Sequence, residues 1–329
     1  MKQLLIIGTV ATVVVSAAAE TVTLAPADGV TTNVLQLFSG DTAVEIAGSG
    51  TVKLNNANSH TGGTTLSSGT LELSGNIPGG SHSPVGAGTF TVSGGILRGS
   101  GTFGGNITGT GEFNIEAPEG WAWTGNHSFA LPVTLADGSL TVADGAMTFS
   151  DNLWLGVGGS DVSFTMTGGS ITMGSKNPQF SPKKYAKSSF TMTGGTFNAN
   201  GKNVLTGYQT TSATNSFDVS GSAVFYNVGN VYTYSGSGNV MDINVHDGGT
   251  LDRSAIYNGN DNAGTAKTNL RVDGGILRCN KKGSTETSYA LWIGQTSANV
   301  KRQLTSFTIG PKGATFTTDN GDASGVMQI

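Results

Sequence analysis

Acidic and basic side chains gather in the last third of the chain. The densest group comprises Asp242, Asp247, Asp252 and Arg253, with Asp273 further along. Carboxylates beside a cation can serve as general acid, general base or nucleophile, the chemistry by which enzymes cleave polysaccharides. Aspartate is equally common in tight turns, because its side chain hydrogen-bonds the local backbone. A catalytic group and ordinary turn chemistry are therefore both open, and the elements that carry these residues must decide between them.

An internal repeat provides those elements. Gly-Gly or Gly-Ser pairs begin at positions 168, 194, 221, 248 and 274, so that the successive gaps are 26, 27, 27 and 26. Each pair follows a segment of alternating apolar and polar residues, such as Phe164-Thr165-Met166 and Phe190-Thr191-Met192. A period of about 20 to 50 residues indicates a solenoid, whose units bury their apolar faces only against their neighbours.

The contents of one period favour strands over helices. Alternation with a period of two places Phe, Met, Val and Ile on one strand face and Thr, Ser and Asp on the other. Glycine after the strand reaches positive φ without steric penalty, which a sharp corner needs. A propeller blade usually needs about 40 residues or more, which is longer than this period. We predict an all-β fold, a right-handed parallel β-helix with coils of 26–27 residues.

Stacked coils give the acidic residues a specific arrangement. Asp247 and Asp273 precede glycine pairs that are one period apart. The prediction places the two carboxylates above one another, about 4.8 Å apart along the stack. At that separation they would share a proton or bind a cation, although the equivalent positions Thr167, Thr193 and Ser220 fit ordinary turn chemistry.

Composition excludes several classes of partner. The 329 residues include 51 glycines, about twice the usual ~7% share, while charged residues make up 12% against a typical ~25%. The formal charge of -4 comes without clustered lysine and arginine, so no nucleic-acid or anionic-membrane partner is expected. We also expect no transmembrane helix, because no segment after the N-terminus offers about 20 apolar residues.

The cysteine and the histidines predict neither a cofactor nor a metal site. Cys279 is the sole cysteine, which excludes an intrachain disulfide, and no local base accompanies it as a catalytic thiol would require. His60, His82, His127 and His246 lack metal-ligand spacing, such as a pair at i and i+4. His60 and His82 fall in polar, turn-like stretches, where we expect them to be solvated.

The aromatic residues leave two interpretations open. Trp121 and Trp123 flank Ala122, and three tyrosines cluster near one turn, at positions 226, 232 and 234. Exposed aromatic rings would stack on sugars, which makes a carbohydrate or another surface ligand a candidate partner. Aromatic residues in a solenoid also stack on one another, coil on coil.

The N-terminus has the features of an export signal. Lys2 supplies a positive charge, residues 4–15 form a mainly apolar run, and Ala17-Ala18-Ala19 offers a small-residue cleavage site. The run is too short to span a bilayer. We predict a signal peptide over residues 1–19, N-terminal coils over 20–150 and coils with regular Gly-Gly turns over 151–329.

Residues 51–73 carry a recognisable motif. Leu54, Asn58, the run Thr61-Gly62-Gly63-Thr64-Thr65 and Gly69-Thr70-Leu71 occur in order. This segment resembles the autotransporter-associated β-strand repeat of bacterial passenger domains, which usually has an aromatic residue where this chain has His60. The resemblance implies a β-helical passenger on or beyond the surface of a Gram-negative-type bacterium. Members of the full autotransporter type continue into a membrane β-barrel, so a passenger fragment and a freely secreted protein both stay open.

The sequence thus predicts a secreted or surface-displayed β-helix with a structural or adhesive role. The alternative is a polysaccharide-active β-helix enzyme, a lyase or hydrolase, with its site among the acidic residues named above. A third possibility is a protein that aids the secretion or display of a neighbouring region. The repeat does not specify an oligomeric state.

Overall fold

The computed structural model describes residues 3–6, 10–11, 20–74, 76–77, 83–157, 160–180, 187–207, 212–233, 238–258, 266–279 and 304–318. All the regular structure among these residues is strand, and the strands pair in parallel from coil to coil. The predicted right-handed parallel β-helix is confirmed. The chain divides into two compact units, residues 1–134 with 138–149 (unit 1) and residues 135–137 with 150–329 (unit 2).

Most strands of unit 1 are short and are joined by tight turns. Its strands are β1 (Gln3–Ile6), β2 (Val10–Ala11), β3 (Thr21–Leu24), β4 (Thr31–Val34), β5 (Ala43–Ile46), β6 (Thr51–Leu54), β7 (Thr64–Leu66), β8 (Thr70–Leu73), β9 (Asn76–Ile77), β10 (Phe90–Val92), β11 (Ile96–Gly99), β12 (Gly101–Phe103), β13 (Ile107–Gly109), β14 (Phe113–Trp123), β15 (His127–Phe129) and β17 (Ala146–Phe149). Strand β16 (Val133–Val142) is divided between the two units.

The coils of unit 1 vary in length. Phe90 pairs with Thr64 of the preceding coil and with Ile107 of the next, so the steps in residue number are 26 and 17. The period of 26–27 residues that the glycine pairs at 168–275 indicate therefore does not extend through this unit. Apolar side chains nevertheless form continuous inward columns, because each pairing keeps the same strand face toward the core. One column runs through Leu66, Val92, Gly109 and Phe129, and its three side chains are fully buried or nearly so.

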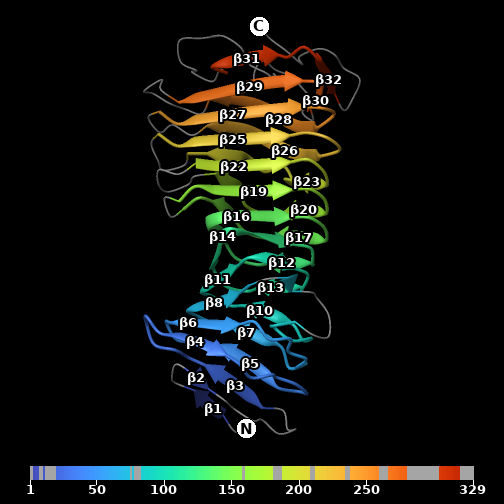
Figure 1. The fold of residues 1–329 in the computed structure, drawn as a ribbon. Helices are drawn as coiled ribbons and strands as arrows, with labels where there is room; N and C mark the ends of the chain where they lie inside the picture. The colour runs from blue at the N-terminus through green and yellow to red at the C-terminus, as the bar shows by residue number, and fades with distance from the viewer. Residues whose placement is uncertain are drawn as a thin grey trace. The chain divides into compact units, whose positions relative to one another are not determined.

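Unit 2 contains longer and more regular strands. They are β18 (Leu153–Leu155), β19 (Val162–Met166), β20 (Ser170–Met173), β21 (Pro178–Phe180), β22 (Lys187–Met192), β23 (Thr196–Asn198), β24 (Val204–Thr206), β25 (Thr214–Val219), β26 (Val224–Thr233), β27 (Val240–His246), β28 (Thr250–Asn258), β29 (Lys267–Asp273), β30 (Gly275–Cys279), β31 (Ser306–Ile309) and β32 (Ala314–Thr318). In Figure 1 the strands β19, β22, β25, β27 and β29 lie one above another, as their pairing requires.

The register of unit 2 follows the predicted period. Along one inward column, residues pair in the order Phe164, Phe190, Phe217, Ile243, Leu270 and Phe307. The first four steps in residue number are 26, 27, 26 and 27, and the last is 37. The rings of Phe164, Phe190 and Phe217 stack with centroids 5.5 and 5.3 Å apart, within 7° of parallel. Burial of these rings between adjacent coils is the main stabilising contribution that the repeat provides.

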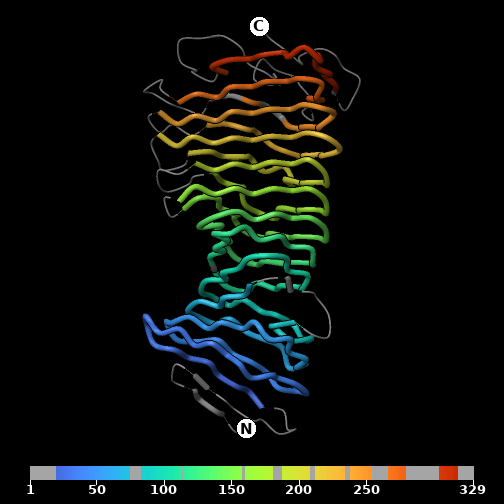
Figure 2. The backbone as a smooth tube through the Cα atoms, viewed as in Figure 1, coloured from blue at the N-terminus to red at the C-terminus, as the bar shows by residue number. Residues whose placement is uncertain are grey.

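Glycines and asparagines hold the corners. Gly195 adopts a φ of 76°, and a Cβ there would lie 2.6 Å from the carbonyl oxygen of Gly168 in the preceding coil, so only glycine fits. At another corner the Asn203 N–H donates to Asn177 Oδ1 at 3.0 Å, and the Asn230 N–H donates to Asn203 Oδ1 at 2.7 Å. Figure 2 shows the backbone turning at matching places in successive coils.

The N-terminal segment carries strands of its own. β1 pairs in parallel with β3, and β2 with β4. Cleavage of residues 1–19 as a signal peptide stays a prediction, and such cleavage would leave β3 and β4 as the first coil. Among the described residues we find no helix with the length and apolarity that crossing a membrane requires.

Candidate functional site

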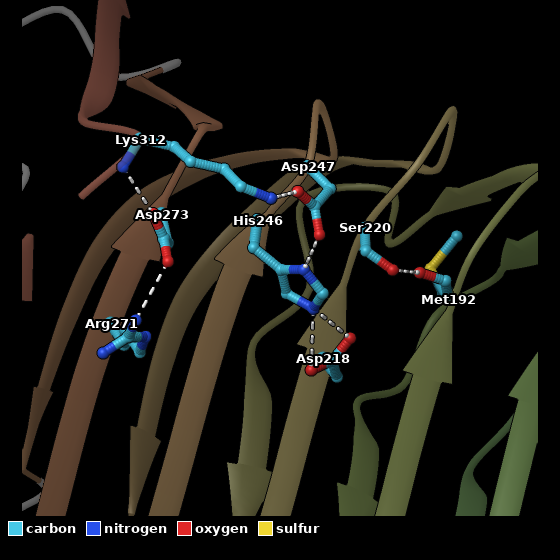
Figure 3. Close-up of polar contacts among 8 residues, drawn as sticks. All are labelled: Met192, Asp218, Ser220, His246, Asp247, Arg271, Asp273 and Lys312. Atoms are coloured by element: carbon cyan, nitrogen blue, oxygen red, sulfur yellow. Dashed lines mark hydrogen bonds and ion pairs between the residues drawn. The ribbon is translucent and has the colours of Figure 1, made fainter. Parts of the chain in front are cut away.

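The most concentrated group of interacting charges lies at the carboxyl ends of three stacked strands. Parallel strands in register place their ends at one edge, so turn residues of successive coils meet there. We call the group the ionic turn cluster, and Figure 3 shows its members. They are Asp218 of β25, His246 of β27, Asp247 just after β27, Arg271 and Asp273 of β29, and Lys312 in the turn between β31 and β32.

His246 lies between two carboxylates. Its Nδ1 is 2.8 Å from Asp247 Oδ2, and its Nε2 is 3.0 and 3.2 Å from the two carboxylate oxygens of Asp218. Only the doubly protonated ring can donate on both sides. The hydrogen bond to Asp247 raises the pKa of His246 above its ordinary 6.5, and Asp218 adds to this, against an opposing contribution from burial.

Lys312, in the turn between β31 and β32, contacts both Asp247 and Asp273 and so joins its own coil and that of β29 to the cluster. Its ammonium group pairs with Asp247 Oδ1, and its backbone N–H donates to Asp273 Oδ1 at 2.8 Å. Arg271 Nη2 donates to the other oxygen of Asp273 at 2.9 Å. Lys312, then His246, lowers the pKa of Asp247, while the Lys312 backbone and then Arg271 lower that of Asp273. Both carboxyl groups are thus held as anions, which opposes a role as general acid.

The two aspartates do not stack as predicted. Asp273 pairs with His246 in the ladder, and not with Asp247. Val245 pairs with Val272, a step of 27, whereas Gly248 and Gly274 differ by only 26, so the strand register and the glycine spacing differ by one. Asp247 leaves the ladder in a left-handed conformation, with φ 50°, while its N–H donates to the carbonyl of Asp273 at 3.1 Å. The carboxylates are bridged by Lys312 and do not share a proton.

The other predicted candidates lie elsewhere. Asp242 is on the outer face of β27, where its Oδ1 accepts a hydrogen bond from Asn269 at 2.8 Å. Asp252 and Arg253 belong to β28 and are 6% and 1% exposed. Arg253 Nη1 donates to the carbonyl of Arg278 at 2.6 Å. Since Asp252 and Arg253 are withdrawn from solvent, they do not face an open groove together with Asp247.

Two histidines are core residues. The prediction that His60 is solvated is wrong, because its side chain is fully buried and its Nε2 lies 2.8 Å from Thr64 Oγ1. Burial lowers the pKa of His60 to about 4 and that of His127 to about 3. His127 occupies an inward column between Ile107 and Met147. His82 lies outside the described residues, as does the side chain of Cys279.

No group of metal-binding side chains occurs in the described part of the chain. The described residues include no cluster of three or more His, Cys, Asp or Glu side chains that could hold a metal ion. The ionic turn cluster has one histidine and three carboxylates, but Lys312 and Arg271 occupy carboxylate oxygens that a cation would need.

The tryptophans are also interior residues. Trp121 and Trp123 are 2% and 0% exposed, and their rings meet edge to face with centroids 5.2 Å apart. His127 lies 4.7 Å from Trp123 and joins the same aromatic group. Of the two predicted alternatives for these tryptophans, mutual packing is therefore correct, and they offer no platform for sugars. Tyr234 lies outside the described residues.

Comparison with known families finds one match. Residues 47–73 match the model of the passenger-associated-transport-repeat, and they include β6, β7 and β8. Within this segment Gly63 takes a φ of 86° at the turn, and His60 packs edge-on against Phe38 with ring centroids 5.8 Å apart. His60 therefore fills an aromatic position as an aromatic ring would. No curated protein and no solved structure matches the chain.

Proposed function

We propose that the protein is a secreted or surface-displayed passenger-type β-helix with a structural or adhesive role at the surface of a Gram-negative-type bacterium. The observation that carries this proposal is the passenger-associated-transport-repeat at residues 47–73, within a chain whose described strands form β-helix coils. The repeat points to an exported passenger-type protein. The structural or adhesive role and the location at the cell surface are what we propose beyond this match.

The outer face of unit 2 supports a contact role. Ser163, Ser189, Ser216, Asp242 and Asn269 follow one another in register along the outward side of successive strands. Such a column presents hydroxyl, amide and carboxylate groups at a regular spacing of about 4.8 Å on a rigid frame. A frame of this kind orders many weak polar contacts in advance, which lowers the entropic cost of binding an extended surface.

The ionic turn cluster adds little support for the enzyme alternative. Both ring nitrogens of His246 already contact carboxylates, and Asp247 and Asp273 are held as anions. A general base needs a free lone pair directed at the substrate, and a general acid needs a proton to donate. In this cluster the His246 protons and the oxygens of Asp247 and Asp273 are already engaged with one another, Lys312 and Arg271.

The test compares native host cells that make the wild-type protein with cells that lack it. We expect extracellular protease to remove the wild-type protein from intact cells, and adherence to a polysaccharide- or protein-coated surface to fall when the protein is missing. Phe190→Asp, which places a charge in the core column, is the control for dependence on the folded coils. Protein found only inside cells, with adherence unchanged, would overturn the proposal.

A parallel assay addresses the enzyme alternative. Purified protein is incubated with pectin and alginate, and unsaturated products are followed by their absorbance. We expect no product. Product formation that Asp247→Ala abolishes would move the function to polysaccharide cleavage.

A further inference from the structure

We propose that His246, held between Asp218 and Asp247, is a proton-dependent clip that fastens the last coils of unit 2 and releases them when the ring becomes neutral. This inference goes beyond the proposed function, because it concerns how the end of the β-helix responds to pH. It rests on the geometry of one imidazole ring and the carboxylates at its two nitrogens.

The clip is part of a continuous chain of charged contacts. Asp218 of β25 contacts His246 of β27, which contacts Asp247, which in turn contacts Lys312 in the turn after β31. Lys312 then reaches β29 through Asp273. Four stacked coils are linked in this way, and Figure 3 shows the side chains lying in sequence across the ends of their strands. A change at the ring is thereby transmitted to the turn that carries Lys312.

Histidine is the residue type among these contacts whose ordinary pKa lies near neutral pH. Asp218, Asp247 and Asp273 are the acidic groups around the ring and its partners, and Arg271 and Lys312 are the basic ones. Asp247 raises the pKa of Lys312 further above its ordinary value, and arginine stays charged throughout. A neutral ring keeps one N–H and presents a lone pair to the carboxylate on the other side, at a distance of about 3 Å. That contact changes from attraction to repulsion.

The sign of the pH effect follows from the direction of the shift. The folded protein holds the His246 proton more tightly than the ordinary value of 6.5. The stabilising contribution of the clip is therefore complete below about pH 6.5 and is lost as the pH rises through the pKa of the folded ring. Because a single proton is involved, the opening equilibrium of the last coils changes by at most about tenfold per pH unit.

Amide hydrogen exchange of the whole protein tests the clip. Protection factors, which correct for the intrinsic pH dependence of exchange, are compared for residues 306–318 and 214–219 between about pH 6 and pH 8.5. A Cys279→Ser background removes the thiol, because cysteine has an ordinary pKa of about 8.5, within the pH range of the experiment. We expect protection of 306–318 to fall as the pH rises in this background, and to be independent of pH when His246→Gln is added.

Two controls separate the clip from general charge effects. Asp242→Asn removes a carboxylate on the same strand that does not contact the ring, and it should keep the wild-type pH dependence. Asp218→Asn removes one side of the clip, and NMR titration of His246 should then give a lower pKa than in the wild type. Equal pH slopes in wild type and His246→Gln, or an unshifted titration in Asp218→Asn, would overturn the proposal.

Discussion

Replacing Phe190 by alanine should weaken unit 2 more than any surface change on the same strand. Its ring is 1% exposed and stacks between Phe164 and Phe217, with centroid distances of 5.5 and 5.3 Å. Phe197 also meets it edge to face at 5.5 Å. Truncation of a buried phenylalanine to alanine typically costs about 3–5 kcal/mol, because apolar contacts are lost and a cavity is left. At about 1.4 kcal/mol per factor of ten, 4 kcal/mol raises the opening equilibrium of the adjacent coils about a thousandfold.

Hydrogen exchange on β19, β22 and β25 measures this effect locally, which matters because coils of a solenoid depend mainly on their neighbours. Thr191→Ala is the matched control, since Thr191 points outward from the same strand and is half-buried. Surface substitutions of that kind usually change stability by less than about 0.5 kcal/mol. If Phe190→Ala and Thr191→Ala lowered protection equally, the stacked inward column would not be the main source of stability in these coils.

Three further predictions concern the corners, the buried histidine and the outer charges. Gly195→Ala should lower the free energy of unfolding in urea by at least about 1 kcal/mol more than Gly201→Ala does. Both glycines have φ near 75°, but only at Gly195 does a backbone atom lie where the new Cβ would be. Burial holds the pKa of His127 at about 3, so between pH 6.5 and 3 the unfolded chain takes up a proton that the folded ring does not. This histidine alone should lower the free energy of unfolding of unit 1 by about 1.4 kcal/mol per pH unit as the pH falls, in addition to the effect of His60. His127→Phe should remove that share of the slope in thermal unfolding at several pH values. Arg98→Met removes a cation that is paired with Glu116. It should lower the free energy of unfolding by less than about 1 kcal/mol, and this difference from the wild type should vanish in about 1 M salt.

The fold was predictable because its signal is repeated. The Gly-Gly or Gly-Ser pairs that begin at 168, 194, 221, 248 and 274 each mark a turn that follows a strand. Because the same strand and turn recur at a nearly constant spacing, each copy of the repeat supports the same prediction. In unit 1 the step from coil to coil varies, being 26 before Phe90 and 17 after it, so no fixed spacing marks the coils. The strand faces there are still set by alternation, as in β15, where His127 and Phe129 point inward and Ser128 outward. Reading that alternation would have placed His127 in the core.

The site was less predictable because it depends on single-residue register. The glycine spacing placed Asp247 over Asp273, but the ladder pairs Asp273 with His246. The reason is that two residues separate Val245 from Gly248, whereas only one separates Val272 from Gly274. Lys312 was not identified, as the 37-residue step to the next coil hides its approach to Asp247. The asparagine contacts at the corners, such as Asn203 with Asn177, were also missed. Their signal was the spacing of 26 between the two asparagines, which matches the glycine period.

Cysteine accessibility on intact cells tests the central claim, an exported β-helix displayed at the surface, most directly. In a Cys279→Ser background, Thr193→Cys places a thiol on an exposed turn of unit 2, and Met192→Cys places one at a fully buried inward position next to it. A membrane-impermeant maleimide should label Thr193→Cys on intact native cells and label Met192→Cys only after denaturation. Labelling of Thr193→Cys only after lysis would contradict surface display, and equal labelling of both positions in the folded protein would contradict the inward and outward alternation of the β-helix.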